Sequence, residues 1–137
     1  MAADALVLAV NGTLMRGLEL NGNLLRAGAR FLREARTAPA YRLYSIGDVH
    51  PAMQRVAEGG VCVALELWEL PAANVARVLR EEPAGLCVGK VELEDGAQVL
   101  GVLGEAWLCA RGRDITTHGG WRAYLATQQQ RTSPGGR

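Results

Sequence analysis

The sequence predicts an α+β fold in which a small, closed or nearly closed mixed β-barrel is flanked by one or two helices. Two observations carry this prediction. Helical spacing of apolar residues is clear only in the short segment 72–81. Strand-like segments, either alternating in polarity or continuously apolar, recur at residues 5–11, 41–46, 61–70, 86–93 and 99–103.

The first half of the chain contains three of these strands. Residues 5–10 read ALVLAV, an uninterrupted apolar run that is typical of a strand buried on both faces, and the turn-forming pair Asn11-Gly12 closes it. The segment 24–36 has helical spacing, but it is short enough to be a strand with broken alternation. Its residues alone leave both readings open. YRLYSI at 41–46 alternates, and residues 61–70 are rich in Val, Leu and Trp.

The second half begins with a helix and ends in a polar tail. Pro71 is suited to a helix start, and Glu81-Glu82-Pro83 ends the helix. Glu94-Asp95-Gly96 predicts a hairpin turn between the last two strands. Residues 103–109 can extend the sheet, and residues 121–126 can form a last helical turn. We predict a single domain over residues 1–127 and a disordered tail over 128–137, where QQQRTSPGGR lacks apolar side chains.

Composition excludes several classes of partner. The chain has 137 residues, with 15 basic and 14 acidic side chains and a net charge of +1. It contains no long block of like charge, so we expect neither nucleic acid nor a membrane as a partner. The apolar run at the start is too short to span a bilayer and lacks the flanks of a secretory signal, which predicts a cytoplasmic protein.

The cysteines and histidines predict neither disulfides nor metal. Cys62, Cys87 and Cys109 are odd in number and widely spaced, which is typical of reduced, largely buried thiols. The chain has two histidines, His50 in a turn before a proline and His118 before Gly-Gly, and few further ligands. We therefore expect no metal and no cofactor.

Several segments resemble motifs of the gamma-glutamylcyclotransferase-like family, and together they cover about residues 5–126. The C-terminal segment is similar to the end of the C-terminal domain of allophanate hydrolase, which has the same fold. The first matching segment is NGTLMRG at 11–17, which resembles the family motif Y-G-[ST]-L-x-x-G. The others are Thr37 with YRLY at 41–44, residues 59–70, and EPAGL at 82–86. The segments similar to the allophanate hydrolase domain are RDIT at 113–116 and GGWRAYL at 119–125.

This resemblance has consequences for the fold and also shows two departures. It implies a short helix after the first loop and then a strand at residues 30–37. It places the chain closest to stand-alone proteins that resemble the allophanate hydrolase C-terminal domain. Asn11 stands where the family has a tyrosine. Leu14 stands where allophanate hydrolase domains often carry a histidine.

The candidate site combines the first loop with an acidic residue. Main-chain N–H groups around Asn11, Gly12, Thr13 and Leu14 can form a nest for a carboxylate, although such a loop can also be an ordinary turn. The resemblance favours the pocket and points to Glu82 as a general acid and base. Desolvation near the sheet would raise the pKa of such a carboxyl. Glu81 competes for this role, and the alternative is that both glutamates are solvated.

Three functions stay open, and the resemblance implies the first two. The first is an enzyme acting on a small carboxylate-bearing amide or carbamate, as the allophanate hydrolase C-terminal domain is implicated in breaking down an N-carboxylated carbamate to ammonia and carbon dioxide. The second is a cyclotransferase that releases 5-oxoproline from a gamma-glutamyl compound. The third is a non-catalytic module that binds a metabolite and partners a separate amidase. A homo-oligomer is possible in each case. Guanidinium groups suited to clamping a carboxylate are Arg16, Arg42, Arg113 and Arg122.

Overall fold

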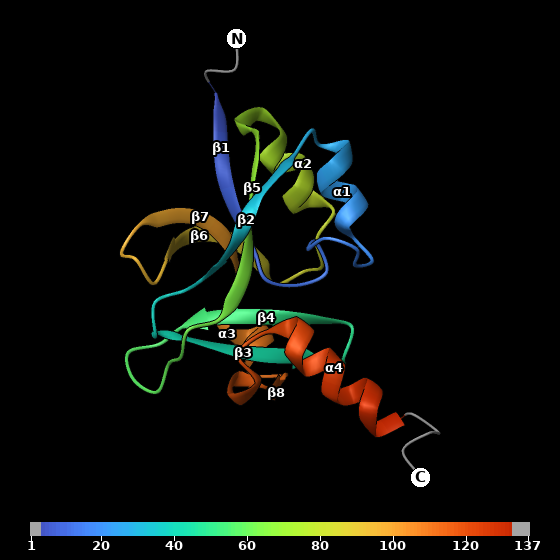
Figure 1. Cartoon of the computed structure of the whole chain (residues 1–137), viewed down its shortest axis with the longest axis vertical. Helices are drawn as coiled ribbons and strands as arrows, with labels where there is room; N and C mark the ends of the chain where they lie inside the picture. The colour runs from blue at the N-terminus through green and yellow to red at the C-terminus, as the bar shows by residue number, and fades with distance from the viewer. Residues whose placement is uncertain (1–3, 133–137) are drawn as a thin grey trace.

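The strands form two sheets in a computed structural model that describes residues 4–132 (Figure 1). The larger sheet has the order β2-β5-β1-β7-β6, and the smaller has the order β4-β3-β8. The larger sheet is mixed, because β1 pairs antiparallel with β5 but parallel with β7. The strands are β1 (Ala5–Val10), β2 (Arg30–Arg36), β3 (Tyr41–Ile46), β4 (His50–Arg55), β5 (Ala64–Pro71), β6 (Leu86–Glu92), β7 (Gln98–Gly104) and β8 (Arg113–Asp114).

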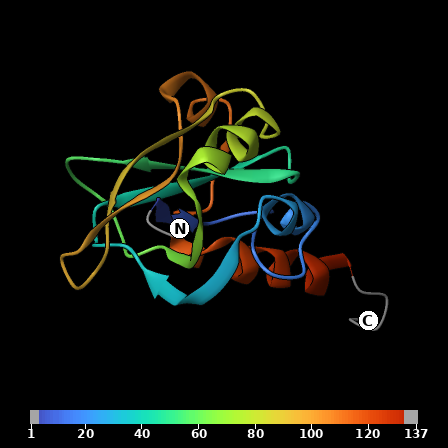
Figure 2. The same ribbon diagram turned by 90° about the horizontal axis from the view of Figure 1, so that it is seen from above.

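The helices are short except for the last. They are α1 (Asn21–Arg26), α2 (Val75–Arg80) with a 3₁₀ turn before it (Ala72–Asn74), α3 (Ala106–Cys109) and α4 (Trp121–Thr132), which a second 3₁₀ turn (Thr116–His118) precedes. Figures 1 and 2 show α1 and α2 side by side next to the larger sheet, with α4 beside the smaller one. None of the helices within residues 4–132 is long and apolar enough to cross a membrane.

The expectation of one closed barrel is wrong in its details, because β3 belongs to the second sheet. β3 pairs with β4 along one edge and with β8 along the other, which leaves it no edge for the larger sheet. The sequence did not predict β4, because the pair His50-Pro51 is typical of the end of a strand. Proline lacks the N–H of a ladder and is tolerated on edge strands, and β4 is the edge of its sheet.

The ends of several elements also differ from the prediction. Val61 makes an isolated bridge with Tyr41, so β5 starts later than residue 61. β7 ends at Gly104, and residues 106–109 form α3 instead of extending the sheet. Gly104 packs closely on β4, since an added Cβ would lie 2.7 Å from the Ala52 Cβ. The strand at 30–36, implied by the resemblance, is confirmed as β2.

The C-terminal segment is more ordered than predicted. Residues 121–132 form the helix α4, whereas we expected one turn over 121–126 and disorder from residue 128. The buried rings of Trp121 and Tyr124 anchor its start, and the glutamines that follow are good helix formers. The remaining part of the predicted tail, 133–137, lies outside the described residues. Cys62, Cys87 and Cys109 are free thiols, of which Cys109 is buried and the other two are half-buried.

The hydrophobic core joins the two sheets. Leu8 on β1, Leu65 on β5, Leu43 on β3 and Met53 on β4 belong to one buried cluster, each no more than 2% exposed. Burying a side chain of this kind contributes roughly 1.5–3 kcal/mol. Because this core spans both sheets, it fixes the start of β4 against the ends of β1 and β7, and a small cavity lies at that junction.

Candidate functional site

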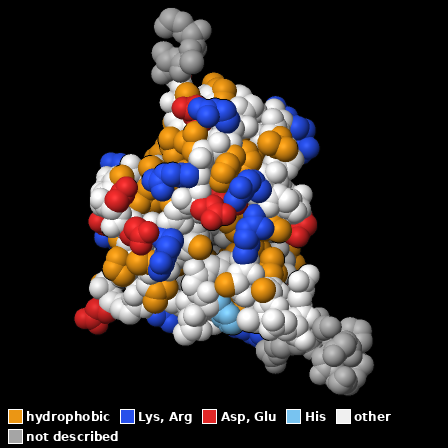
Figure 3. Space-filling view, in the orientation of Figure 1, with side chains coloured by type: hydrophobic (Ala, Val, Ile, Leu, Met, Phe, Trp, Pro, Cys, Tyr) orange, Lys and Arg blue, Asp and Glu red, His pale blue; other side chains and the backbone are white. Residues whose placement is uncertain are grey.

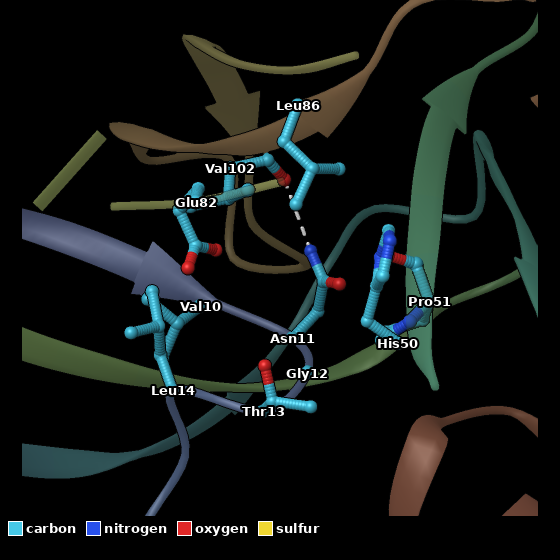
Figure 4. Close-up of a pocket in the computed structure, with 10 residues that line it drawn as sticks. All are labelled: Val10, Asn11, Gly12, Thr13, Leu14, His50, Pro51, Glu82, Leu86 and Val102. Atoms are coloured by element: carbon cyan, nitrogen blue, oxygen red, sulfur yellow. Dashed lines mark hydrogen bonds between the residues drawn. The ribbon is translucent and has the colours of Figure 1, made fainter. Parts of the chain in front are cut away.

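The cavity lies where the chain leaves β1, next to β7, the start of β4 and the turn that follows α2 (Figure 4). Its enclosed volume is about 10 Å³, room for about one water molecule, so a ligand of several heavy atoms requires the side chains that line it to move. Neither lysine nor arginine is among its lining residues. These are Val10, Asn11, Gly12, Thr13, Leu14, His50, Pro51, Glu82, Leu86 and Val102.

The first loop is fixed by its carbonyl groups. The Gly12 carbonyl accepts a hydrogen bond from the Met15 N–H at 3.0 Å, and the Thr13 carbonyl accepts one from the Leu20 N–H at 3.0 Å. The N–H groups of Gly12, Thr13 and Leu14 donate to no partner within the described part of the chain. These three main-chain donors are therefore available to a ligand, as an anion-binding nest requires.

Gly12 is required by its neighbour. A Cβ at this position would lie 2.6 Å from the Pro51 Cδ, closer than atoms can pack, so the loop and β4 can approach only with glycine here. The glycine predicted from the sequence as a site residue thus sets the distance between the loop and the smaller sheet.

Asn11 is buried and held in one orientation. Its Nδ2 donates to the Val102 carbonyl at 3.0 Å (dashed in Figure 4), and a carbonyl can only accept. This contact leaves Oδ1 as a free acceptor, since it has no hydrogen bond to any residue between 4 and 132. The Thr13 hydroxyl also makes no hydrogen bond within this range, and Figure 4 shows it directed into the cavity.

Glu82 extends from the turn after α2 into the same cavity (Figure 4). Its Oε2 is buried and has no hydrogen-bond partner among the described residues. Burial, and secondarily the negative charge of Glu81, raises the pKa of Glu82 to about 7. A carboxyl with this pKa can both give and take a proton at neutral pH. Glu81 is exposed and does not line the cavity, so the structure brings Glu82, not Glu81, to the predicted loop.

The candidate arginines do not reach this cavity. Arg16 and Arg122 instead bind the buried carboxylate of Glu66, with Arg16 Nε at 3.1 Å and Arg122 Nη2 at 3.2 Å from Oε2. Arg42 pairs with Asp114 at 2.6 Å, and Arg113 is exposed. Figure 3 shows basic and acidic side chains interspersed on the face seen in Figure 1. The protein itself therefore supplies a carboxylate for three of the four candidate guanidinium groups.

His50 is the polar lining residue that the sequence did not predict. It is 7% exposed, and its ring Nδ1 lies 3.0 Å from the Pro51 carbonyl oxygen. A sequence signal for it exists, because Gly47-Asp48 directly after YRLYSI is typical of a hairpin turn. Such a turn predicts that His50 begins a second strand paired with residues 41–46. The other histidine, His118, lies in a separate groove beside α4, where its ring packs edge-on against Tyr124 at 5.2 Å.

The fold is shared with gamma-glutamylcyclotransferase-like proteins. The chain superposes on an AIG2-like mouse protein with a TM-score of 0.55 and 23% identity, over 74% of this chain and 77% of that one. At this level of identity the likeness concerns the fold alone.

The chain belongs to the family of allophanate hydrolase C-terminal domains, whose profile matches residues 6–126. A uropathogenic E. coli-specific protein is 56% identical, with a TM-score of 0.88 over 89% of this chain and 96% of that chain. Kluyveromyces lactis allophanate hydrolase is 31% identical, with a TM-score of 0.86 over 91% of this chain and 22% of the enzyme.

Curated relatives are much longer proteins. The urea amidolyase of Saccharomyces cerevisiae is 32% identical over 138 residues, which is 96% of this chain but 8% of that protein. The urea amidolyase of Lachancea kluyveri is also 32% identical, and 7% of its length is matched. The chain thus spans less than a tenth of these relatives and corresponds to one region of a multidomain enzyme.

Proposed function

We propose that this domain is an enzyme that acts on a small, carboxylate-bearing carbamate or amide, with Glu82 as its general acid and base. The observation that carries the proposal is the buried, unpartnered Glu82 carboxyl on a cavity whose first loop offers free main-chain N–H groups. The resemblance to the allophanate hydrolase C-terminal domain, whose family the chain belongs to, supports an N-carboxylated carbamate as the substrate.

Charge favours this assignment. The cavity lining contains no cation, so an anionic substrate depends on the N–H groups of Gly12, Thr13 and Leu14. Preorganised N–H donors of this kind are each worth about 2.7–4 kcal/mol at a developing negative charge. A Glu82 carboxyl with a pKa of about 7 is neutral about half of the time at pH 7, and in that form it does not repel the bound carboxylate.

The proposed reaction transfers two protons to one nitrogen and releases two molecules of carbon dioxide. Glu82 donates its proton to the nitrogen of the N-carboxylated carbamate as one N–C bond breaks, and the electron pair of that bond stays on nitrogen. Carbon dioxide leaves, and carbamate remains. The carbamate takes up a second proton and separates into ammonia and carbon dioxide, while water reprotonates the Glu82 carboxylate. No covalent intermediate is required, in keeping with a cavity lining that has no cysteine or lysine.

Release of 5-oxoproline from a gamma-glutamyl compound stays the second candidate reaction for the same cavity. A separate amidase would supply the substrate where the domain is not fused to one, since the curated relatives hold the matching region within much longer chains. We place this reaction in the cytoplasm, where the free thiols of the described chain stay reduced. A non-catalytic binding module is the remaining alternative.

The decisive test compares Glu82→Gln with the wild type. Glutamine keeps the shape of the neutral carboxyl but carries no transferable acid proton, so we expect release of carbon dioxide to slow by about two to four orders of magnitude. The substrate is generated in situ by an allophanate-cleaving amidase, and rates are read above its spontaneous decay. Glu81→Gln removes the same charge one residue away, outside the cavity, and should keep most of the activity.

Two results would reject the proposal. The first is a wild-type protein that does not accelerate the decay, which would favour the binding module. The second is a Glu82→Gln variant with the full wild-type rate, which would show that the proton comes from another group.

A further inference from the structure

The cavity has donors on one side and acceptors on the other. The free N–H groups of Gly12, Thr13 and Leu14 all donate, and the Glu82 carboxyl donates in its neutral form. A carboxylate ligand satisfies these groups, but it has no hydrogen to offer in return. An acceptor on the cavity wall therefore selects for a second feature of the ligand.

His50 provides such an acceptor. Its Nδ1 lies 3.0 Å from the Pro51 carbonyl oxygen, which can only accept, so Nδ1 carries the hydrogen of the neutral ring. The lone pair then resides on Nε2, which has no hydrogen bond to another residue of the described chain. His50 is 7% exposed and lines the cavity, so bulk water has little access to this ring.

Asn11 provides the second acceptor. The contact between its Nδ2 and the Val102 carbonyl prevents the amide from turning, which leaves Oδ1 open to the cavity. In Figure 4 this oxygen is on the side of Asn11 that faces His50, whereas Glu82 lies on the opposite side. Asn11 occupies the position at which the sequence departs from the tyrosine of the resembling family, and a fixed amide oxygen only accepts where a phenol can also donate.

We infer that Asn11 Oδ1 and His50 Nε2 form an acceptor pair that recognises N–H hydrogens of the ligand. The cavity then selects molecules with nitrogen next to their carboxyl or carbonyl carbon, such as carbamates and amides, over their carbon isosteres. This inference rests on the proposed function only in taking the cavity as the ligand site, and it needs no turnover. An isostere without the N–H displaces water from the two acceptors and leaves them unpaired, and we expect this mismatch to lower affinity about five- to fiftyfold.

Oxamate and pyruvate are a matched pair of probes. Both are small monocarboxylates with the same number of heavy atoms, and they differ only in an amino group against a methyl group. Titrations followed by calorimetry, and by NMR for millimolar affinities, should show tighter binding of oxamate to the wild type by this factor. In His50→Phe, which has no acceptor, the ratio should approach one while pyruvate affinity changes little. His50→Gln restores a side-chain oxygen and should keep part of the preference.

His118→Gln is the control, because it removes the other histidine of the sequence, which lies in the groove beside α4. It should leave the ratio unchanged. A wild-type ratio near one, a preference that survives in His50→Phe, or no saturable binding of oxamate would each overturn the inference. The wild-type ratio and His50→Gln decide the matter if His50→Phe does not fold. Because these titrations measure binding and not a rate, a failure here is distinct from a failure of the Glu82→Gln rate test.

Discussion

Glu66 is fully buried and Glu82 is half-buried, and their carboxyl groups have opposite environments. The Glu66 carboxylate accepts hydrogen bonds from the Arg16 main-chain N–H at 2.9 Å, from the Trp68 indole at 3.1 Å and from the guanidinium groups of Arg16 and Arg122. Burial opposes its ionisation, but these donors outweigh burial and lower the pKa of Glu66. Glu82 has burial without donors, and its pKa is raised.

The difference shows how one residue type serves two purposes. A carboxylate with all its donors in place is a structural element, because its charge is fixed and its proton is gone at any physiological pH. A carboxyl left without partners keeps a proton that can be transferred, at a cost in stability. The pair also predicts opposite responses to substitution, in which removing one glutamate destabilises the protein and neutralising the other stabilises it.

The largest effect on stability is expected from Glu66→Leu. The substitution leaves the Trp68 indole and the Arg16 N–H without an acceptor and separates two guanidinium groups from their shared carboxylate, so we expect a loss of about 2–4 kcal/mol in the free energy of unfolding. Denaturant titration measures it. Glu34→Gln, which removes the exposed partner of Arg16, is the control and should cost much less. Equal losses would mean that the burial of Glu66 is unimportant.

Glu82→Gln should have the opposite sign. The native pKa of about 7 lies above the ordinary value of 4.5, so the native state binds more protons between these pH values and the free energy of unfolding falls as pH rises through them. Glutamine does not ionise, so the variant should be more stable than the wild type by about 1–3 kcal/mol at pH 8. The difference should vanish below about pH 4. A variant that is less stable at pH 8 would show that the carboxylate has an unrecognised partner.

Glu81→Gln should have the smallest effect. The charge of Glu81 is the secondary cause of the raised Glu82 pKa, so its removal should move the pH range over which stability falls to slightly lower values. The same series of unfolding curves from pH 4 to 9 measures this movement. If instead the dependence on pH disappears, the repulsion between the glutamates, and not burial, governs Glu82.

The sequence predicted the strands better than their assembly. Periodicity located β1, β3, β6 and β7 to within a few residues, because each has a clear apolar or alternating pattern. Which strands share a sheet depends on contacts between distant residues, such as Gly104 against Ala52, that no local pattern encodes. β4 was hidden by its own proline, and α4 by glutamines that are polar but favour helix.

For the site, the sequence and the family resemblance together selected residues that the fold does bring to one cavity, namely the loop 11–14 and Glu82. The choice between Glu81 and Glu82 needed the structure, because a one-residue difference at a helix end decides which side chain faces inward. The partners of Arg16 and Arg122 could not be foreseen either, since Glu66 reads in the sequence as an ordinary position of an alternating strand.

The contact between Gly12 and the ring of Pro51 has a consequence for how this domain can diversify. One wall of the cavity belongs to the larger sheet and the other to the smaller, and the two meet here without space for a single methyl group. Enlarging the cavity at the contact between Gly12 and Pro51 would require the two sheets to separate, and the core that they share opposes this. New substrates are therefore more accessible to evolution through exchanges at Leu14, Leu86 or His50, where a change of side chain alters the lining while the backbone stays in place.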